Sequence, residues 1–349
     1  MPLSTSYRGR RAATIQSRDL RVTVLIEGGH IAEIHDMATD VNPLWTPPWP
    51  SMEPSLFDRE KHSAYGAAVD ASLLAGIMGH NLCLDIFGGP SQEEAAAGLP
   101  VHGEASLVIY DVYGSGNELT MKAHLPLAEL QVERRIEIHA RRVRIRETVQ
   151  NLGGTDRPVG WTEHVTLGPP FLKKGSTQFR ASAVRSRVHE TPFGTADYLA
   201  PAQDFDWPDA PLANGGACDL RRFTEATSSS AYTAHLMDPA HRHAFFVAFS
   251  PEFELAFGYV WPRDAFPWLG IWEENVSRAQ PPWHGQTLTR GMEFGVSPFP
   301  ESRRQMVDRG RLFETPTYRW IPAASRVSVE YWCVCQTAAA VPETLEWPA

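Results

Sequence analysis

Three short segments of this sequence hold side chains that could act together as acids and bases. His102 lies in "GLPVHGEA", on a proline-led turn followed directly by Gly103. His164 lies within "VGWTEHVTLGPPFL", and Glu293 lies within "TRGMEFGVSPFP". A carboxyl group in such an apolar run is desolvated, which raises its pKa and makes it a usable base near neutral pH. Histidine changes its charge in the same pH range. The three residues therefore indicate acid–base chemistry, although each one alone is equally typical of a packed structural residue.

Motifs for other kinds of chemistry are weaker. The sequence contains neither a glycine-rich phosphate loop nor a dinucleotide-binding fingerprint, so we expect no cofactor. Thirteen histidines, with "HRH" at 241–243, could in principle supply metal ligands. The surrounding "DPAHRHAFF" is typical of a turn that enters a strand, and we therefore expect no bound metal. A cupin-like metal-dependent β-barrel enzyme remains an alternative.

The four cysteines do not form a disulfide pattern. Cys83 and Cys218 are isolated, and Cys333 and Cys335 lie in "YWCVCQT", where a strand would send both side chains to the same face. A single CxC pair is weak evidence for zinc, and buried free thiols are the simpler interpretation.

Composition excludes several classes of partner. The net charge is −9, which argues against a nucleic-acid-binding protein because phosphate binding needs an excess of clustered Lys and Arg. The basic stretch "RRVRIRE" at 141–147 alternates, so we interpret it as the solvated face of a strand. No apolar run is long enough to span a membrane, and the first residues lack the apolar core of a signal peptide. We therefore expect a cytoplasmic protein without nucleic-acid or membrane partners, and leave its oligomeric state open.

The hydrophobic pattern has a period of two almost throughout. "LRVTVLIEGGHIAEIHD" (20–36) predicts a hairpin turned at Gly28–Gly29, and similar alternating runs continue to about residue 336. Only 72–82 and 300–310 predict helices, the second opening at Pro300 and Glu301 and closing at Gly310. We therefore expect an all-β fold in which 1–349 form a single domain, a large antiparallel sandwich with a core over about 20–336 and few short helices.

Two long loops interrupt the strands at 42–63 and 195–219. Both are rich in Pro, Trp, Phe and Asp. Long loops within a compact domain are usually functional. Flat aromatic faces next to carboxylates suit a sugar, whose C–H groups stack on rings while its hydroxyl groups need acceptors. A purely structural wrap is the alternative. The sequence thus predicts a small-molecule sugar, or a sugar derivative, as ligand.

Taken in order, these segments resemble the aldose 1-epimerase (galactose mutarotase-like) superfamily. "LPVHGEA", "TEHVTLGPPF" and "GMEFGVSPFP" follow the order of the family's His-Gly, second His and C-terminal strand Glu. "FPWLGIWEEN" (266–275) looks like the strand before the catalytic glutamate, and the opening "VTVLIEGGHIAEI" followed by "NPLW" looks like the family's N-terminus. The similarity covers about residues 20–336 and implies a β-supersandwich.

The resemblance also implies roles for individual residues. Glu293 matches the general base that takes the proton of the anomeric hydroxyl, and His164 matches the general acid that protonates the ring oxygen. His102 matches the histidine that binds and orients the sugar, next to a backbone that the sugar approaches closely. For the family's sugar-gripping aspartate we choose Asp206, with Asp204 close behind.

Some positions depart from the family's pattern. The family's arginine upstream of His-Gly has no clear match, because that region reads "MGHNLCLDIFGG" with His80 and Asn81. Glu163 stands next to His164 where the family has Asn. We include His80 and Trp272 among the candidate substrate-binding residues. The implied activity is interconversion of sugar anomers, and a non-catalytic carbohydrate-binding protein or a different sugar enzyme on the same fold is the alternative.

Overall fold

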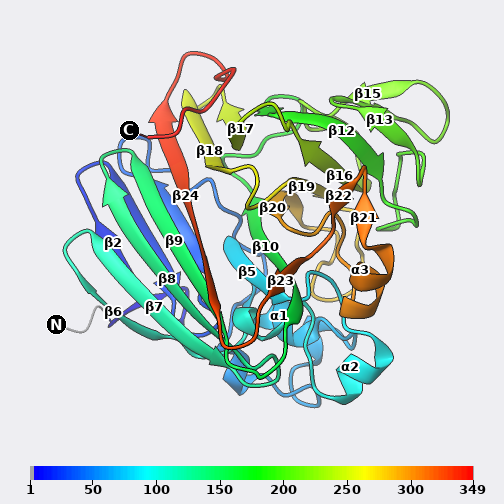
Figure 1. The fold of residues 1–349 in the computed structure, drawn as a ribbon. Helices are drawn as coiled ribbons and strands as arrows, with labels where there is room; N and C mark the ends of the chain where they lie inside the picture. The colour runs from blue at the N-terminus through cyan, green and yellow to red at the C-terminus, as the bar shows by residue number, and fades with distance from the viewer. Residues whose placement is uncertain (1–3, 349) are drawn as a thin grey trace.

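The structure is a computed structural model that describes residues 4–348. Two large sheets of antiparallel strands pack against each other, with a few short helices at their edges (Figure 1). The fold is therefore the all-β sandwich that the alternating pattern predicted. No helix in residues 4–348 is long and apolar enough to cross a membrane.

The larger sheet carries the candidate catalytic strands. Eleven of its twelve strands follow the order β1 (Ser4–Tyr7), β2 (Arg10–Gln16), β3 (Leu20–Leu25), β4 (Ile31–Asp36), β5 (His80–Asp85), β10 (Arg157–Leu167), β20 (Leu288–Gly295), β19 (Trp268–Asn275), β16 (Ser229–Met237), β12 (Ala183–Val188) and β13 (Asp204–Asp206). The twelfth, β23 (Arg319–Ile321), pairs with the start of β10. Strand β10 is thus central, with β5 on one side and β20 on the other.

The second sheet covers one face of the first. Its eight strands follow the order β11 (Gln178–Ala181), β17 (His243–Ser250), β18 (Leu255–Pro262), β24 (Arg326–Thr337), β9 (Arg142–Asn151), β8 (Leu130–His139), β7 (Glu118–Leu125) and β6 (Asp111–Ser115). Two small hairpins complete the strands, namely β14 (Asp209–Pro211) with β15 (Ala217–Asp219) and β21 (Arg311–Leu312) with β22 (Thr315–Pro316).

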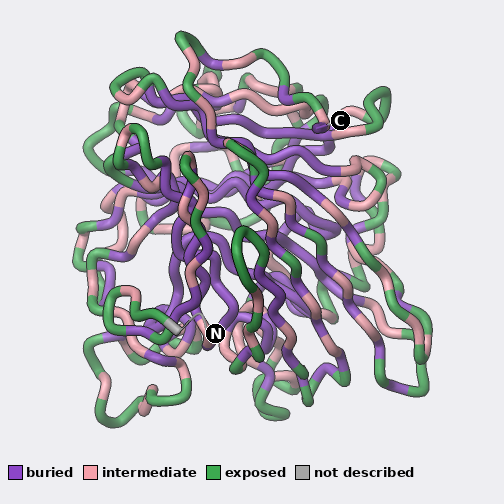
Figure 2. The backbone as a smooth tube through the Cα atoms, turned by 90° about the vertical axis from the view of Figure 1, so that its left-hand side faces the viewer, coloured by how far each residue is buried: buried purple, intermediate pink, exposed green. Residues whose placement is uncertain are grey.

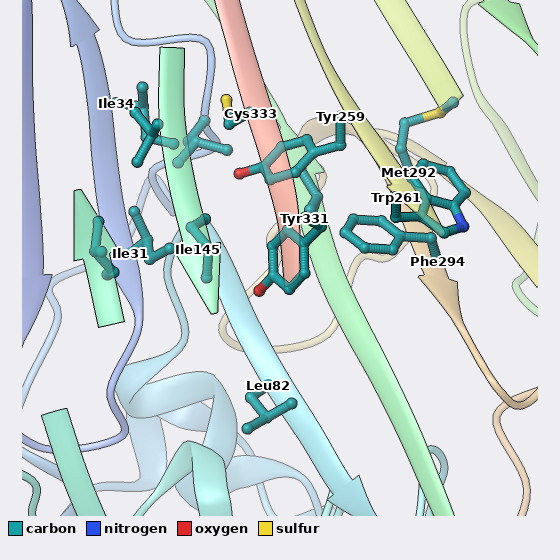
Figure 3. Packing of buried hydrophobic residues seen from close by; sticks show 14 of the residues in the cluster. Ile31, Ile34, Leu82, Ile145, Tyr259, Trp261, Met292, Phe294, Tyr331 and Cys333 are labelled. Atoms are coloured by element: carbon teal, nitrogen blue, oxygen red, sulfur yellow. The ribbon is translucent and has the colours of Figure 1, made fainter. Parts of the chain in front are cut away.

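The main apolar core lies between the two sheets. Figure 3 shows part of it, where Tyr331 of β24 and Tyr259 of β18 face Phe294 of β20. Trp261 stacks on Phe294 with ring centroids 4.3 Å apart. The same cluster includes Cys333, so the alternation in "YWCVCQT" does send sulfur atoms into the core. Buried residues follow the strands, whereas exposed ones gather in the loops (Figure 2).

All four cysteines are free, but only three are buried. Cys218 is half-buried, which corrects the expectation that every thiol lies in the core.

The helices differ from their predicted bounds. Residues 72–82 do not form one helix, because α1 (Ala71–Gly76) ends before Gly79 and the chain then enters β5. Gly79 has φ +58°, and a Cβ there would lie 2.4 Å from the carbonyl oxygen of Ile31, so this turn requires glycine. Pairing with β10 decides the conformation of His80 onward, where local propensity favoured helix.

The last helix, α3 (Arg303–Arg309), begins later than the sequence suggested. Ser302 caps it and forms a capping box with Gln305, which satisfies the first backbone N–H groups better than Pro300 could. It ends at Gly310, as predicted. A further short helix, α2 (Gln92–Ala96), is capped in the same way by Ser91 and Glu94.

The two long loops differ in kind. Residues 42–63 contain a 3₁₀ turn at Pro54–Leu56 and the start of another at Ser63–Tyr65. Residues 195–219 instead contain three short strands, β13, β14 and β15, and are not a bare loop. The predicted hairpin over 20–36 is confirmed, since β3 pairs with β4 and Gly28 and Gly29 both have positive φ.

Candidate active site

His164 and Glu293 meet in the centre of the larger sheet. They are direct partners in the antiparallel pairing of β10 with β20, so their side chains leave the sheet on the same face. His164 Nε2 lies 3.0 Å from Glu293 Oε1, and both side chains are almost fully buried. The fold thus brings together an imidazole and a carboxyl group that are 129 positions apart in sequence.

Glycines make room for the Glu293 carboxyl group. A Cβ on Gly291, two residues earlier on the same face, would lie 2.3 Å from Glu293 Oε1. On the neighbouring strand, a Cβ on Gly270 would lie 2.1 Å from the hydroxyl oxygen of Tyr232. Two glycines within strands are costly for a sheet and often mark a close approach. Here they leave a slot that holds a carboxyl group and a phenol.

Burial controls the charges of this pair. Desolvation raises the pKa of Glu293 to about 8, partly offset by the Tyr232 hydroxyl. Desolvation also lowers the pKa of His164 to about 3. The pair therefore holds one proton through the neutral range. Thr166 Oγ1 lies 3.0 Å from His164 Nδ1 and fixes the orientation of the ring, so that Nε2 faces Glu293.

His102 lies beside the pair. Its ring centroid is 5.1 Å from that of His164, and its buried Nδ1 has no hydrogen-bond partner among residues 4–348. The backbone at His102 has φ +66°, an uncommon conformation for a residue other than glycine. The turn is held on both sides, since His102 N–H donates to Gly88 and Leu84 N–H donates to the His102 carbonyl.

Gly103 is required by packing within the protein. A Cβ there would lie 1.9 Å from the carbonyl oxygen of Leu84 in β5. The close approach that requires glycine is therefore the packing of the turn on β5.

A cavity of about 270 Å³ opens over these three residues. Aromatic rings form much of its wall. Trp45 stacks on Trp283 with centroids 6.3 Å apart, and Trp272 meets Trp283 edge to face at 6.1 Å. Phe193 packs against Tyr232 at 5.0 Å. The predicted aromatic surround is thus present, and it comes from segments that are far apart in sequence.

Of the two long loops, only the first contributes to this cavity. Trp45 lies in the 42–63 segment, whereas no residue of 195–219 is among the lining residues described. The 195–219 segment packs instead on its own small core around Leu199, Ala210 and Leu220.

Two charged residues of the cavity have no signal in the sequence. Arg278 lies 4.8 Å from the ring centroid of Trp283 and pairs with Glu274 at 3.3 Å. Asp70, the residue before α1, lines the cavity as well. Both lie in ordinary polar contexts, and only the tertiary fold brings them to the site. Burial lowers the pKa of Arg278, partly offset by Glu274.

Two candidate substrate-binding residues lie away from the cavity. Asp206 is exposed on β13, the last strand at one edge of the larger sheet, where it pairs with Arg185. Its neighbour Asp204 is bound by Arg187. Both positions were chosen from sequence order, which carries no information about the side on which the segment packs. Neither is therefore part of the site proposed below.

His80 belongs to a buried polar cluster between the sheets. Its Nε2 lies 2.9 Å from Glu163 Oε2, and its Nδ1 lies 3.0 Å from the Tyr259 hydroxyl. Glu163 also accepts from Arg134 at 3.1 Å and from Tyr331 at 2.8 Å. His80 therefore fills a position in the core and is not among the residues that line the cavity.

This cluster lies behind the candidate catalytic strand. Glu163 and His164 are adjacent on β10 and leave it on opposite faces, one toward the second sheet and the other toward the cavity. Arg134 binds both Glu163 and Glu147, and all three side chains are buried. Desolvation raises the pKa of Glu147 to about 7, an effect that Arg134 opposes. The two departures from the family's pattern, His80 and Glu163, are thus partners of each other.

The histidine pair considered for a metal has other contacts. His241 lies 3.5 Å from Asp238, and the His243 ring stacks on Trp347 at 4.5 Å. Within the part of the chain that the structure describes, no three His, Cys, Asp or Glu side chains are grouped to hold a metal ion. The fold does not support the cupin-like alternative, because a twelve-stranded sheet packed on an eight-stranded one differs from the eight-stranded double-sheet jelly roll of cupins.

Comparison with solved structures identifies the fold. A candidate aldose 1-epimerase from Klebsiella pneumoniae superposes with TM-score 0.66 at 13% identity, covering 97% of this chain and 83% of that one. A candidate aldose 1-epimerase from Escherichia coli K12 gives 0.62 at 13% identity, with 93% and 99% coverage. A galactose mutarotase related enzyme from Lactobacillus acidophilus gives 0.58 at 13% identity, with 95% and 99% coverage.

These similarities establish the galactose mutarotase-like fold over nearly the whole chain. No protein-family model matches the sequence, and no curated protein matches it either.

Proposed function

We propose that this protein interconverts the anomers of a sugar by general acid–base catalysis. The observation that carries the proposal is the His164–Glu293 pair, a buried acid and base 3.0 Å apart at the bottom of an aromatic-lined cavity. The fold shared with candidate aldose 1-epimerases supports it. Aromatic walls suit the apolar faces of a pyranose ring, and the cavity is of a size for one ring.

The chemistry requires one group to accept a proton while another donates one. The pKa shifts leave the single proton of the pair on Glu293, so it first passes to His164 across the 3.0 Å contact. The Glu293 carboxylate then takes the proton from the anomeric hydroxyl, and His164 gives its proton to the ring oxygen. The bond between C1 and the ring oxygen then breaks, and the electron pair of the former O–H bond forms the aldehyde. After rotation about the C1–C2 bond the ring closes on the other face, and both protons return. The pair therefore starts and ends each turnover with the same single proton.

The remaining residues bind and orient the sugar. His102 offers a buried Nδ1 that has no partner among residues 4–348, next to the reacting pair. Trp272 lines the cavity 6.1 Å from the His164 ring. A sugar placed between these rings keeps C1 and the ring oxygen close to Glu293 and His164. Holding the reacting atoms in this way supplies a large part of the rate enhancement of such enzymes.

The proposal is tested by measuring anomer exchange directly. Exchange NMR on equilibrated aldoses, with and without the purified protein, measures the rate of interconversion, and titration in the same samples measures binding. We expect exchange that increases linearly with protein concentration. A protein that binds sugars but never accelerates their exchange would contradict catalysis and support the carbohydrate-binding alternative.

A further inference from the structure

The polar groups of the cavity are concentrated around its reacting pair. Besides His164 and Glu293, two lining residues have a buried nitrogen without a hydrogen-bond partner in residues 4–348, namely His102 Nδ1 and Trp272 Nε1. Trp272 Nε1 can only donate. A buried polar atom left unpaired is costly, so these two nitrogens indicate where ligand oxygen atoms belong.

A large part of the remaining wall is apolar, although the Tyr232 hydroxyl and the main chain of Gly88 and Gly89 also reach it. Six aliphatic or phenyl side chains line this part from four separate segments: Leu73, Leu74, Ile77, Phe87, Val101 and Phe193. None of them can form a hydrogen bond through its side chain.

The two charged residues that remain are already partly engaged. The Arg278 guanidinium pairs with Glu274 and lies over the rings of Trp272 and Trp283. Arg278 and Asp70 are both only half-buried, so they face the more solvated part of the cavity. They can form hydrogen bonds with hydroxyl groups at one end of a sugar, but not with those that lie against the apolar wall.

This distribution of polar groups limits the kind of sugar that fits. A hydroxyl group that leaves water for an apolar wall without a partner loses about 1–3 kcal/mol of binding free energy. Replacing that hydroxyl by hydrogen or by an alkyl ether removes the loss and adds apolar contact. We infer that the site takes a sugar with a free anomeric hydroxyl in which one or more other hydroxyl groups are replaced by apolar groups, as in a deoxy or O-alkyl hexose. The requirement for a free anomeric hydroxyl in this inference rests on the proposed function.

Matched sugars test the inference. Exchange NMR compares glucose with 6-deoxyglucose and 3-O-methylglucose, and galactose with 6-deoxygalactose, each rate divided by that sugar's own uncatalysed rate. We expect kcat/KM to be about 10- to 100-fold higher for at least one modified sugar than for its parent, the range within which an apolar pocket discriminates against an added hydroxyl. Equal or higher values for both parent sugars would overturn the inference and leave the proposed function intact.

Binding measurements distinguish a failure of the proposed function from a failure of the inference about the apolar wall. If no sugar exchanges faster with the protein present, the proposed function fails. Ligand-detected NMR titration of the same sugars still compares their affinities, and tighter binding of a modified sugar would support the inference about the wall. Equal binding of all five sugars, or binding of none, would overturn it.

A wall variant gives an independent test. Val101→Thr keeps the shape of the side chain and places a hydroxyl group in the apolar wall. We expect this variant to lower the ratio of kcat/KM for a modified sugar to kcat/KM for its parent severalfold, because a hydroxyl group of the parent sugar gains a hydrogen-bond partner. The matched control is Val184→Thr, at an exposed position of β12, which should leave this kcat/KM ratio unchanged. If Val101→Thr raised the ratio or left it unchanged while the protein stayed folded, the wall would not select the substrate.

Discussion

Glu293 and His164 face each other across neighbouring antiparallel strands, with the carboxyl oxygen 3.0 Å from the imidazole nitrogen. Because β10 and β20 are both interior strands of a twelve-stranded sheet, neither backbone can shift without breaking pairing on its other side. The sheet therefore holds the imidazole and the carboxyl group at a fixed separation before any ligand arrives. Such preorganisation is what general acid–base catalysis needs.

Glu293→Gln should abolish anomer exchange and leave sugar binding nearly intact. The amide keeps the shape of the side chain but does not accept the proton. A positioned acid or base typically contributes about 10²–10⁴-fold, so we expect kcat to fall by that factor, and His164→Asn should behave likewise. Exchange NMR measures the rate, and titration measures the dissociation constant.

The control for this variant is Glu273→Gln, the same change at a buried glutamate on adjacent β19 that lies outside the cavity lining. It should retain exchange activity. If Glu293→Gln kept more than a tenth of the wild-type rate, Glu293 would not be the base.

The pH dependence of the reaction should follow the single proton of the pair. Burial raises the pKa of Glu293 to about 8, whereas burial lowers that of His164 well below the neutral range. Once the pair loses its proton above about pH 8, no group remains to protonate the ring oxygen. We expect kcat/KM to be flat through neutral pH and to fall about tenfold per pH unit above that point. Activity that kept rising between pH 8 and 9.5, after subtraction of the buffer rate, would refute this assignment.

The same shift affects folding stability. The pKa of Glu293 is higher in the folded protein than in the unfolded chain. Its contribution to stability is therefore complete below the pKa of the unfolded chain and is lost as the pH rises through about 8. Relative to wild type, Glu293→Gln should gain stability between pH 5 and 8, by at most about 1.4 kcal/mol per pH unit. Urea unfolding across this range measures the difference.

His102→Asn should weaken sugar binding more than it slows turnover. Asparagine tolerates the positive φ of this position, so the turn is preserved while the imidazole Nδ1 is lost. Loss of one hydrogen bond to the sugar predicts a KM about tenfold higher with a kcat within threefold of wild type. His124→Asn, on the exposed face of β7, is the control. A large fall in kcat at unchanged KM would instead make His102 a third catalytic group.

Arg134→Leu should destabilise the fold severely. Arg134 is the buried cation that binds both Glu147 and Glu163, and its removal leaves two carboxyl groups without a charged partner. Breaking a buried pair in this way costs about 3–5 kcal/mol. The loss should be larger at pH 8 than at pH 5, because burial raises the pKa of Glu147 to about 7 and a protonated Glu147 no longer needs a charged partner. Chemical denaturation measures it, with the half-exposed Arg135→Leu as control. A loss below about 1 kcal/mol would show that the cluster contributes little.

The sequence alone determined the fold class and pointed to the candidate catalytic residues. Alternating hydrophobicity makes each segment bury one face of a strand, so the number and type of elements follow from local pattern. His102, His164 and Glu293 could be chosen because their short motifs follow the order of a known family, and the structure brings all three to one cavity. Helix bounds at 72–82 failed because pairing with β10, a contact between distant segments, overrode local propensity.

Only the tertiary structure decided what surrounds those residues. Arg278, Asp70 and Trp283 reach the cavity through loop conformations, and no periodicity marks them. Asp206 lies outside the cavity for the same reason, since the side on which a loop packs depends on the whole sheet. His80 and Glu163 look like altered site residues in sequence, yet they lie on neighbouring strands of the larger sheet and their side chains meet at 2.9 Å in the core. Strand pattern is a local property of the chain, whereas the neighbours of a side chain are set by contacts between distant segments.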